Sequence, residues 1–143
     1  MYDVRIATEE DIDLVVSLTT KALESTRYVD MIDELTIRNL AQMFLSSSRE
    51  THIILLYKDY GLIAGVCTPF IFGLDNVATE VGIWIEPSER GAKAGSELIE
   101  AFEYWANKLN CKLITFTAVN EKMKKYFEDK EYVLYEQSLV KVL

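Results

Sequence analysis

The sequence predicts one mixed α/β domain, in which a sheet of antiparallel and crossover strands is packed against helices. The apolar period switches repeatedly between two residues, which is typical of strands, and about 3.6 residues, which is typical of helices. These patterns give the order β-α-α-β-β-β-α-β-α-β within 143 residues. Because no repeat, low-complexity tract or Pro/Gly/Ser-rich linker divides the chain, residues 1–143 are expected to form a single domain.

The first part of the chain is expected to hold a strand and two helices. A short strand is predicted over residues 3–7, and Thr8 then precedes an acidic turn that suits the start of a helix. Apolar residues at helical spacing continue this helix to Leu23. A second helix is predicted over residues 33–46, where a run of three serines ends it.

The central part is predicted to be an antiparallel meander. Residues 52–57, 62–72 and 77–85 are rich in β-branched and aromatic side chains, as strands are. Residues 58–61 and 73–76 have the composition of hairpin turns.

The remainder is expected to return to the sheet through a helical crossover. A helix is predicted over residues 95–109, a strand over 112–117, a helix over 120–129 and a final strand over 132–143. A strand that follows a helix in this way pairs in parallel with the strand before it. The apolar last segment also suits pairing across a two-fold axis, so a homodimer remains an open alternative.

Composition excludes several classes of function. The formal net charge of −8 disfavours binding to nucleic acid and favours the approach of a cationic amine. No apolar run approaches the roughly 20 residues that cross a bilayer, and the N-terminus lacks a signal-peptide pattern, so a cytoplasmic protein without a membrane partner is expected. Cys67, Cys111 and the single histidine His52 show no metal-ligand spacing, so we expect buried reduced thiols and no metal site.

The segment from Ile83 to Ser96 carries the clearest chemical signal. It runs from a strand through a loop of small residues into a helix, so backbone N–H groups and the positive end of the helix can converge on a phosphate. A strand-to-helix turn with an exposed basic pair is the plainer alternative. The Walker and dinucleotide fingerprints do not match. The small and basic residues are Arg90, Gly91, Ala92, Lys93, Ala94 and Gly95.

This segment resembles the signature of the GNAT superfamily, Arg/Gln-x-x-Gly-x-Gly/Ala, and the resemblance covers most of the chain. Arg90 and Gly95 occupy the first and last signature positions, and Pro87 fits the lead-in, whereas Lys93 replaces the central glycine. The Arg-Gly-x-x-Ala-Gly variant also resembles acetyltransferases encoded by bacteria and their viruses. The resemblance implies an acyl-CoA-dependent N-acetyltransferase, which transfers acetyl from acetyl-CoA to a primary amine of a small molecule or protein by direct attack in a ternary complex.

The resemblance also implies which residues bind the cofactor. The backbone of residues 91–96, which ends at Ser96, is expected to bind the pyrophosphate, and Ile83 and Ile85 are expected to pair with the pantetheine arm. Lys93 is compatible with this loop if its φ angle is negative. Asn120 is expected near the cofactor, with a helix N-cap as the equal alternative.

Two residues are candidates for catalysis. Glu80 lies among apolar strand residues, where burial would raise its pKa and suit it as the base, and an edge-facing surface glutamate is the alternative. The family's tyrosine acid aligns with Phe127, so Tyr126 is the neighbouring candidate, with a packing or surface role as the alternative. Lys93 and Phe127 together motivate a second hypothesis, a catalytically weak module that binds acyl-CoA or a protein partner.

Overall fold

A computed structural model describes residues 3–91 and 93–143 of the chain. The elements alternate between strands and helices much as the sequence predicts. In chain order they are β1 (Val4–Ile6), η1 (Glu9–Asp11), α1 (Ile12–Glu24), η2 (Val29–Met31), α2 (Glu34–Ser46), β2 (His52–Tyr57), β3 (Gly61–Pro69), β4 (Asn76–Ile85), η3 (Pro87–Glu89), α3 (Ala94–Lys108), β5 (Leu113–Thr115) and α4 (Glu121–Asp129).

The strands form one mixed sheet in the order β1-β2-β3-β4-β5. The first four are antiparallel, and their register places Ile63 of β3 opposite Leu55 of β2 on one side and Ile83 of β4 on the other. After the crossover through α3, β5 pairs in parallel with β4. The predicted fold class, including the antiparallel meander and the parallel crossover pair, is therefore confirmed.

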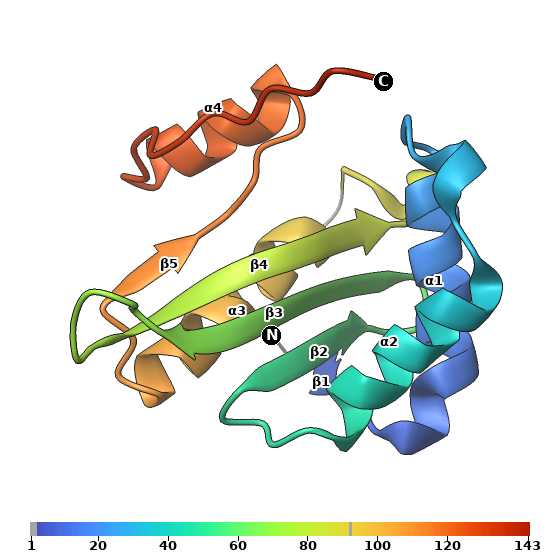
Figure 1. The fold of residues 1–143 in the computed structure, drawn as a ribbon, viewed down its shortest axis with the longest axis horizontal. Coiled ribbons are helices and arrows are strands. Elements are labelled where there is room, and N and C mark those ends of the chain that lie inside the picture. The colour runs from blue at the N-terminus through green and yellow to red at the C-terminus, as the bar shows by residue number, and fades with distance from the viewer. Residues whose placement is uncertain (1–2, 92) are drawn as a thin grey trace.

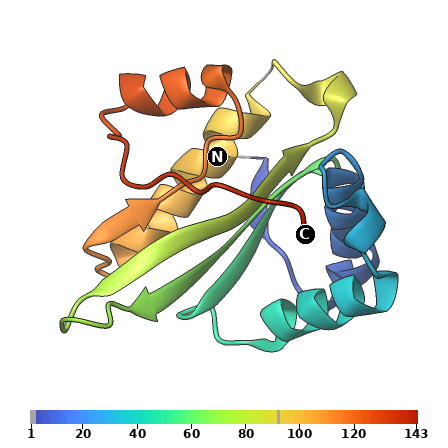
Figure 2. The same cartoon turned by 45° about the horizontal axis from the view of Figure 1, so that its top comes forward.

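Helices cover both faces of the sheet, as Figures 1 and 2 show. On one face α1 and α2 bury an apolar core in which Leu18 and Leu56 are almost completely inaccessible. On the other face α3 packs through Leu98 and Phe102. Gly65 of β3 permits this close approach, because a Cβ atom there would lie only 2.0 Å from the Phe102 ring.

The structure differs from the prediction at three strands. The strand predicted over 112–117 is shorter, since β5 covers only Leu113–Thr115. The strand predicted over 62–72 stops at Pro69, whose ring lacks the N–H that would continue a ladder. Residues 132–143 pair with no strand in the described part of the chain, although the sequence predicted one. The Tyr132 hydroxyl donates to Glu103 of α3 at 2.7 Å, and the segment then runs back past α4 (Figures 1 and 2).

Candidate functional site

The pair β4–β5 separates partway along β4. Parallel pairing joins residues 77–79 to residues 113–115 and stops there, whereas β4 continues for the rest of its length to Ile85. In Figure 1, β5 leads away from β4 toward α4. The second half of β4 therefore has a strand on its β3 side alone within the described part of the chain.

A β-bulge in β4 begins at the same place. Ala64 of β3 pairs with Gly82, and Gly65 pairs with Glu80, so Val81 is an extra residue without a partner. Side chains of a strand alternate between the two faces of the sheet, and the extra residue of the bulge shifts this alternation by one residue. Before the bulge Ala78 packs in the α3 core, and after it Ile83 packs against that core. Glu80 keeps the alternation of Ala78, so its side chain is directed to the α3 face.

Glu80 is buried at the point where the strands part, with 8% of its surface exposed. The Thr117 backbone N–H donates to Glu80 Oε1 at 3.1 Å, so this carboxyl bridges β4 to the chain that leaves β5. Burial raises the pKa of Glu80 above its usual value of 4.5, and the hydrogen bond from Thr117 opposes part of that rise. The expected burial and raised pKa are found, and the surface alternative is wrong.

The outer edge of β4 presents backbone groups of Ile83 and Ile85. The Glu86 N–H donates to Tyr60 O on the β3 side at 2.9 Å. Along a strand, the backbone N–H and C=O groups of successive residues are directed alternately to one neighbouring strand and to the other. Ile85 and Ile83 therefore direct their N–H and C=O groups away from β3. The Ile85 carbonyl accepts from Arg90 Nε at 2.8 Å, while no strand in the described ranges runs beside Ile83 on this side.

The loop from β4 to α3 has the backbone of a sharp turn. Gly91 has φ +89°, a left-handed conformation that favours glycine. Lys93, the N-cap of α3, has φ −84° and ψ −11°, so its negative φ meets the condition for a lysine at this position. Ala92, also expected to bind the pyrophosphate, lies outside the described residues.

The N-terminus of α3 is shaped for close approach. Its first N–H groups, on Ala94, Gly95 and Ser96, have no partner within the helix, because the first turn of any helix leaves them unsatisfied. A Cβ on Gly95 would lie 3.4 Å from Ile85 Cδ1, which is an ordinary van der Waals contact, so the helix start lies against the end of β4. Ser96 Oγ donates to the Lys93 carbonyl at 3.0 Å, and the free N–H groups of a helix start are donors that suit an anion.

Arg90 secures this loop through its side chain. Besides its hydrogen bond to Ile85, its guanidinium lies 4.4 Å from the centroid of the Trp84 ring, a cation–π contact. Lys21 of α1 pairs with Glu86 at 2.6 Å and holds the start of the loop against α1. No sequence pattern signals either contact, because both depend on how the loop folds back over β4.

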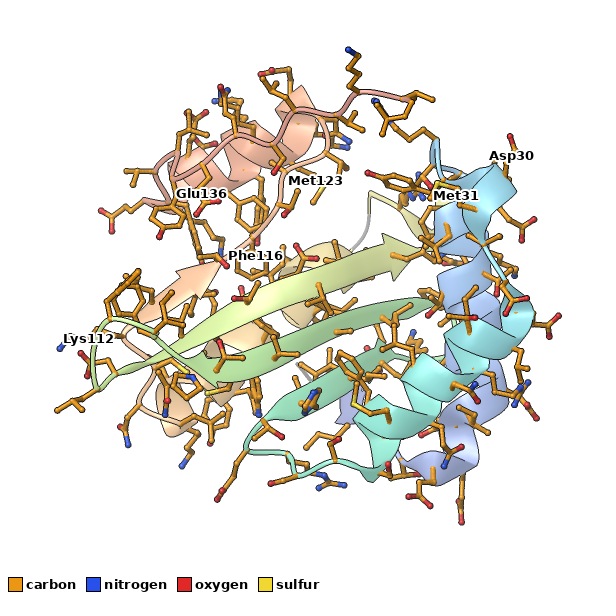
Figure 3. The ribbon with its side chains drawn as sticks, in the orientation of Figure 1. Asp30, Met31, Lys112, Phe116, Met123 and Glu136 are labelled. Atoms are coloured by element: carbon orange, nitrogen blue, oxygen red, sulfur yellow. The ribbon has the colours of Figure 1, made fainter. Side chains whose placement is uncertain are left out.

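Asn120 caps α4. Its Oδ1 accepts from the Met123 N–H at 2.9 Å, so the N-cap alternative is confirmed for the side-chain oxygen. In Figure 3, Met123 lies between α4 and β4, and Met31 of η2 lies farther along, near the tip of β4. Asn120 therefore positions the helix that stands over the separated strands.

Phe127 and Tyr126 are directed into different surroundings. Phe127 is buried, and its ring stacks on Phe116, which follows β5, with 4.7 Å between centroids. The Tyr126 hydroxyl is buried with no hydrogen-bond partner among the described residues, and Lys130 Nζ lies 5.4 Å from its ring centroid. No hydrogen bond between described residues joins Tyr126 to Glu80, whose carboxyl accepts from Thr117.

The structure thus brings most of the predicted cofactor residues to one end of β4. Glu80, Ile83 and the start of α3 lie along one strand and the loop that follows it, whereas Asn120 and Tyr126 belong to α4. Thr117, which holds Glu80, was not predicted, because nothing in the sequence marks a backbone donor. Within residues 3–91 and 93–143, no cluster of three or more His, Cys, Asp or Glu residues suits a metal, and no helix is long and apolar enough to span a membrane.

Comparison with known proteins agrees with this arrangement. The sequence model of the acetyltransferase (GNAT) family matches residues 15–130, which is most of the chain. A search of curated proteins finds no match.

Solved structures share the fold along nearly the whole chain. An acetyltransferase from Trypanosoma brucei superposes with a TM-score of 0.74 at 19% identity, covering 98% of both chains. A ribosomal-protein-alanine N-acetyltransferase from Brucella melitensis biovar Abortus gives 0.72 at 15% identity, covering 99% of both. An aminoglycoside antibiotic 6′-N-acetyltransferase from Acinetobacter haemolyticus gives 0.71 at 15% identity, covering 98% of this chain and 96% of its own. At these identities the likeness concerns the fold.

Proposed function

This chain belongs to the acetyltransferase (GNAT) family, and from that premise we propose that it transfers an acetyl group from acetyl-CoA to a primary amine of a small molecule or protein. One observation carries the proposal. The exposed edge of β4 is followed directly by the N-terminus of α3, so an extended amide chain could bind along the strand edge and a phosphate could bind next to it at the helix start. The backbone of Ile83 suits the first, and the N–H groups of Ala94, Gly95 and Ser96 suit the second.

The loop fits an anionic group on several counts. Gly91 and Gly95 remove side-chain bulk, and exposed Lys93 adds a positive charge beside the helix start. Arg90 acts through the loop, since its side chain is engaged with Trp84 and Ile85. Acetyl-CoA, when bound, supplies the acetyl thioester on which the amine acts.

Glu80 is the proposed base for the attacking amine. An amine must lose a proton to attack a carbonyl, and a carboxyl with a raised pKa accepts that proton more readily at neutral pH. Its bond to Thr117 fixes Glu80 where the strands part, close along β4 to Ile83. The net charge of −8 favours the approach of a cationic acceptor, and we propose the cytoplasm as the place of reaction.

Tyr126 is the proposed proton donor to the departing thiolate. Its hydroxyl is buried and lies near Lys130, whose ammonium group is a donor only, so the hydroxyl proton is available to an acceptor. The alternative function is a catalytically weak module that binds acyl-CoA or a protein partner. The resemblance motivates it, because Lys93 replaces the signature glycine and Phe127 aligns with the family's tyrosine, and Phe127 is buried against Phe116.

A thiol-release assay separates the two functions. The protein is mixed with acetyl-CoA and a panel of small-molecule and peptide amines, and acetylated products are identified by mass spectrometry. An N-acetyltransferase releases CoA thiol and forms an acetyl amide in an amine-dependent way. Saturable acetyl-CoA binding without amine-dependent release would refute the enzyme and leave the binding module.

A further inference from the structure

The two cysteines of the chain are in contact at the end of the sheet remote from the β4–α3 loop. Cys67 lies on β3, and Cys111 lies in the turn between α3 and β5. Their Sγ atoms are 3.5 Å apart, and both residues pack in or against the core beneath α3. Their separation of 44 residues along the chain does not indicate this pair.

The backbone holds both residues in place. The Cys67 N–H donates to Thr51 O at 2.8 Å, and the Cys111 N–H donates to Ala106 O at 3.0 Å. Next to Cys111, the Lys112 N–H donates to Asn76 O at 2.8 Å. A disulfide has an S–S length of about 2.05 Å, so the sulfurs need to approach by about 1.5 Å.

A small reagent can reach this pair from solvent. Cys67 is buried with 8% exposure, whereas Cys111 is half-buried and is therefore the first thiol to be reached. A surface hollow of about 460 Å³ is lined by Cys67, Lys108 and Asn110, so it borders the buried partner, while Cys111 follows Asn110 directly in the chain. Both cysteines are free thiols in the structure.

We propose that Cys67 and Cys111 form a modification site, at which a low-molecular-weight disulfide such as oxidised glutathione converts the two thiols into one intramolecular disulfide. The Cys111 thiolate attacks a sulfur of the reagent, forms a mixed disulfide and releases one thiolate. The Cys67 thiolate then attacks the Cys111 sulfur and displaces the second. The protein loses two protons and two electrons, and the reagent is reduced to two thiols.

The new bond ties β3 to the turn from which β5 begins. It closes a loop of 44 residues, which restricts the unfolded chain and raises Tm by roughly 5–15 °C. Burial beside Cys67 raises the pKa of Cys111 to about 11, so little thiolate is present at neutral pH and the exchange is slow there. The test is therefore run at about pH 8.5, where the thiolate is more abundant.

The experiment treats the folded protein with oxidised glutathione and measures intact mass, alkylation of remaining thiols and Tm. The wild type is expected to lose two hydrogens, to resist alkylation at both cysteines, to gain Tm and to return to its starting mass with dithiothreitol. The Cys67→Ala variant is expected to stop at the mixed disulfide, one glutathione heavier. The Cys111→Ala variant is expected to react more slowly, because Cys67 alone is buried.

Three results would overturn the proposal. The first is that both thiols of the native protein stay open to alkylation under conditions that oxidise the urea-unfolded chain. The second is that glutathione stays on Cys111 of the wild type and no internal bond forms. The third is that the bond forms between two copies, which a non-reducing gel would show as a dimer.

Discussion

Replacement of Glu80 by glutamine separates the chemical role of this carboxyl from its structural one. In the wild type, the Thr117 N–H donates to Glu80 Oε1 at 3.1 Å. The introduced amide keeps an oxygen that can accept this hydrogen bond, but it cannot accept a proton from an amine. We expect Glu80→Gln to fold and bind acetyl-CoA like the wild type and to lose about 10²–10⁴-fold in turnover. Glu80→Ala also leaves the Thr117 N–H without its acceptor, which costs about 1–3 kcal/mol and lowers Tm by roughly 3–10 °C.

The pH dependence of unfolding gives an independent check on the same residue. Because burial raises the pKa of Glu80 in the folded state, the native protein binds this proton more tightly than the unfolded chain does. That contribution to stability is complete below the usual value of 4.5 and is lost as pH rises through the folded pKa. Urea unfolding at several pH values should show Glu80→Gln gaining stability relative to the wild type as pH rises. Wild-type turnover by Glu80→Gln, with product confirmed by mass spectrometry, would refute Glu80 as the base.

Three further substitutions test the surroundings. Gly65→Ala places a Cβ 2.0 Å from the buried Phe102 ring and should lower Tm by at least roughly 3–10 °C. Gly82→Ala is the control, because a Cβ there has nothing within 4 Å, and it should change Tm little. Equal shifts of the two variants in thermal melts would contradict the packing described. Asn120→Ala removes the cap of α4 at a cost of about 1 kcal/mol, seen by urea unfolding, and Asn120→Ser should recover most of it. Tyr126→Phe removes a buried hydroxyl without a described partner, so stability should be kept while turnover falls about 10²-fold; unchanged turnover would assign the proton to water.

Local patterns in the sequence were sufficient to predict most of the fold. Strand and helix periods placed α2, β2 and α4 within one or two residues of their observed bounds, because each has a clear start or end signal. The same patterns gave a wrong prediction for the final segment, residues 132–143. Its apolar residues favour a strand, but a strand needs a partner, and the ladder of β5 holds only Leu113–Thr115.

The candidate site was only partly predictable, since several of its features arise from tertiary contacts. Gly91 and Lys93 were predicted from the signature, and their backbone angles suit the loop. The bulge at Val81, the donation from Thr117 and the contact of Arg90 with Trp84 depend on register and on side chains folding over the sheet. No local pattern encodes such contacts, because their partners lie on other elements or across a turn.

Calorimetric titration of the protein with acetyl-CoA tests the central claim most directly. Lys93→Glu and Lys108→Glu make the same charge change at opposite ends of α3, roughly 20 Å apart along the helix, so the second is a matched control for net charge. We predict binding with a Kd on the order of micromolar, weakened about tenfold by Lys93→Glu and little changed by Lys108→Glu. Absence of saturable binding, or equal weakening by both variants, would contradict an acyl-CoA site at the start of α3.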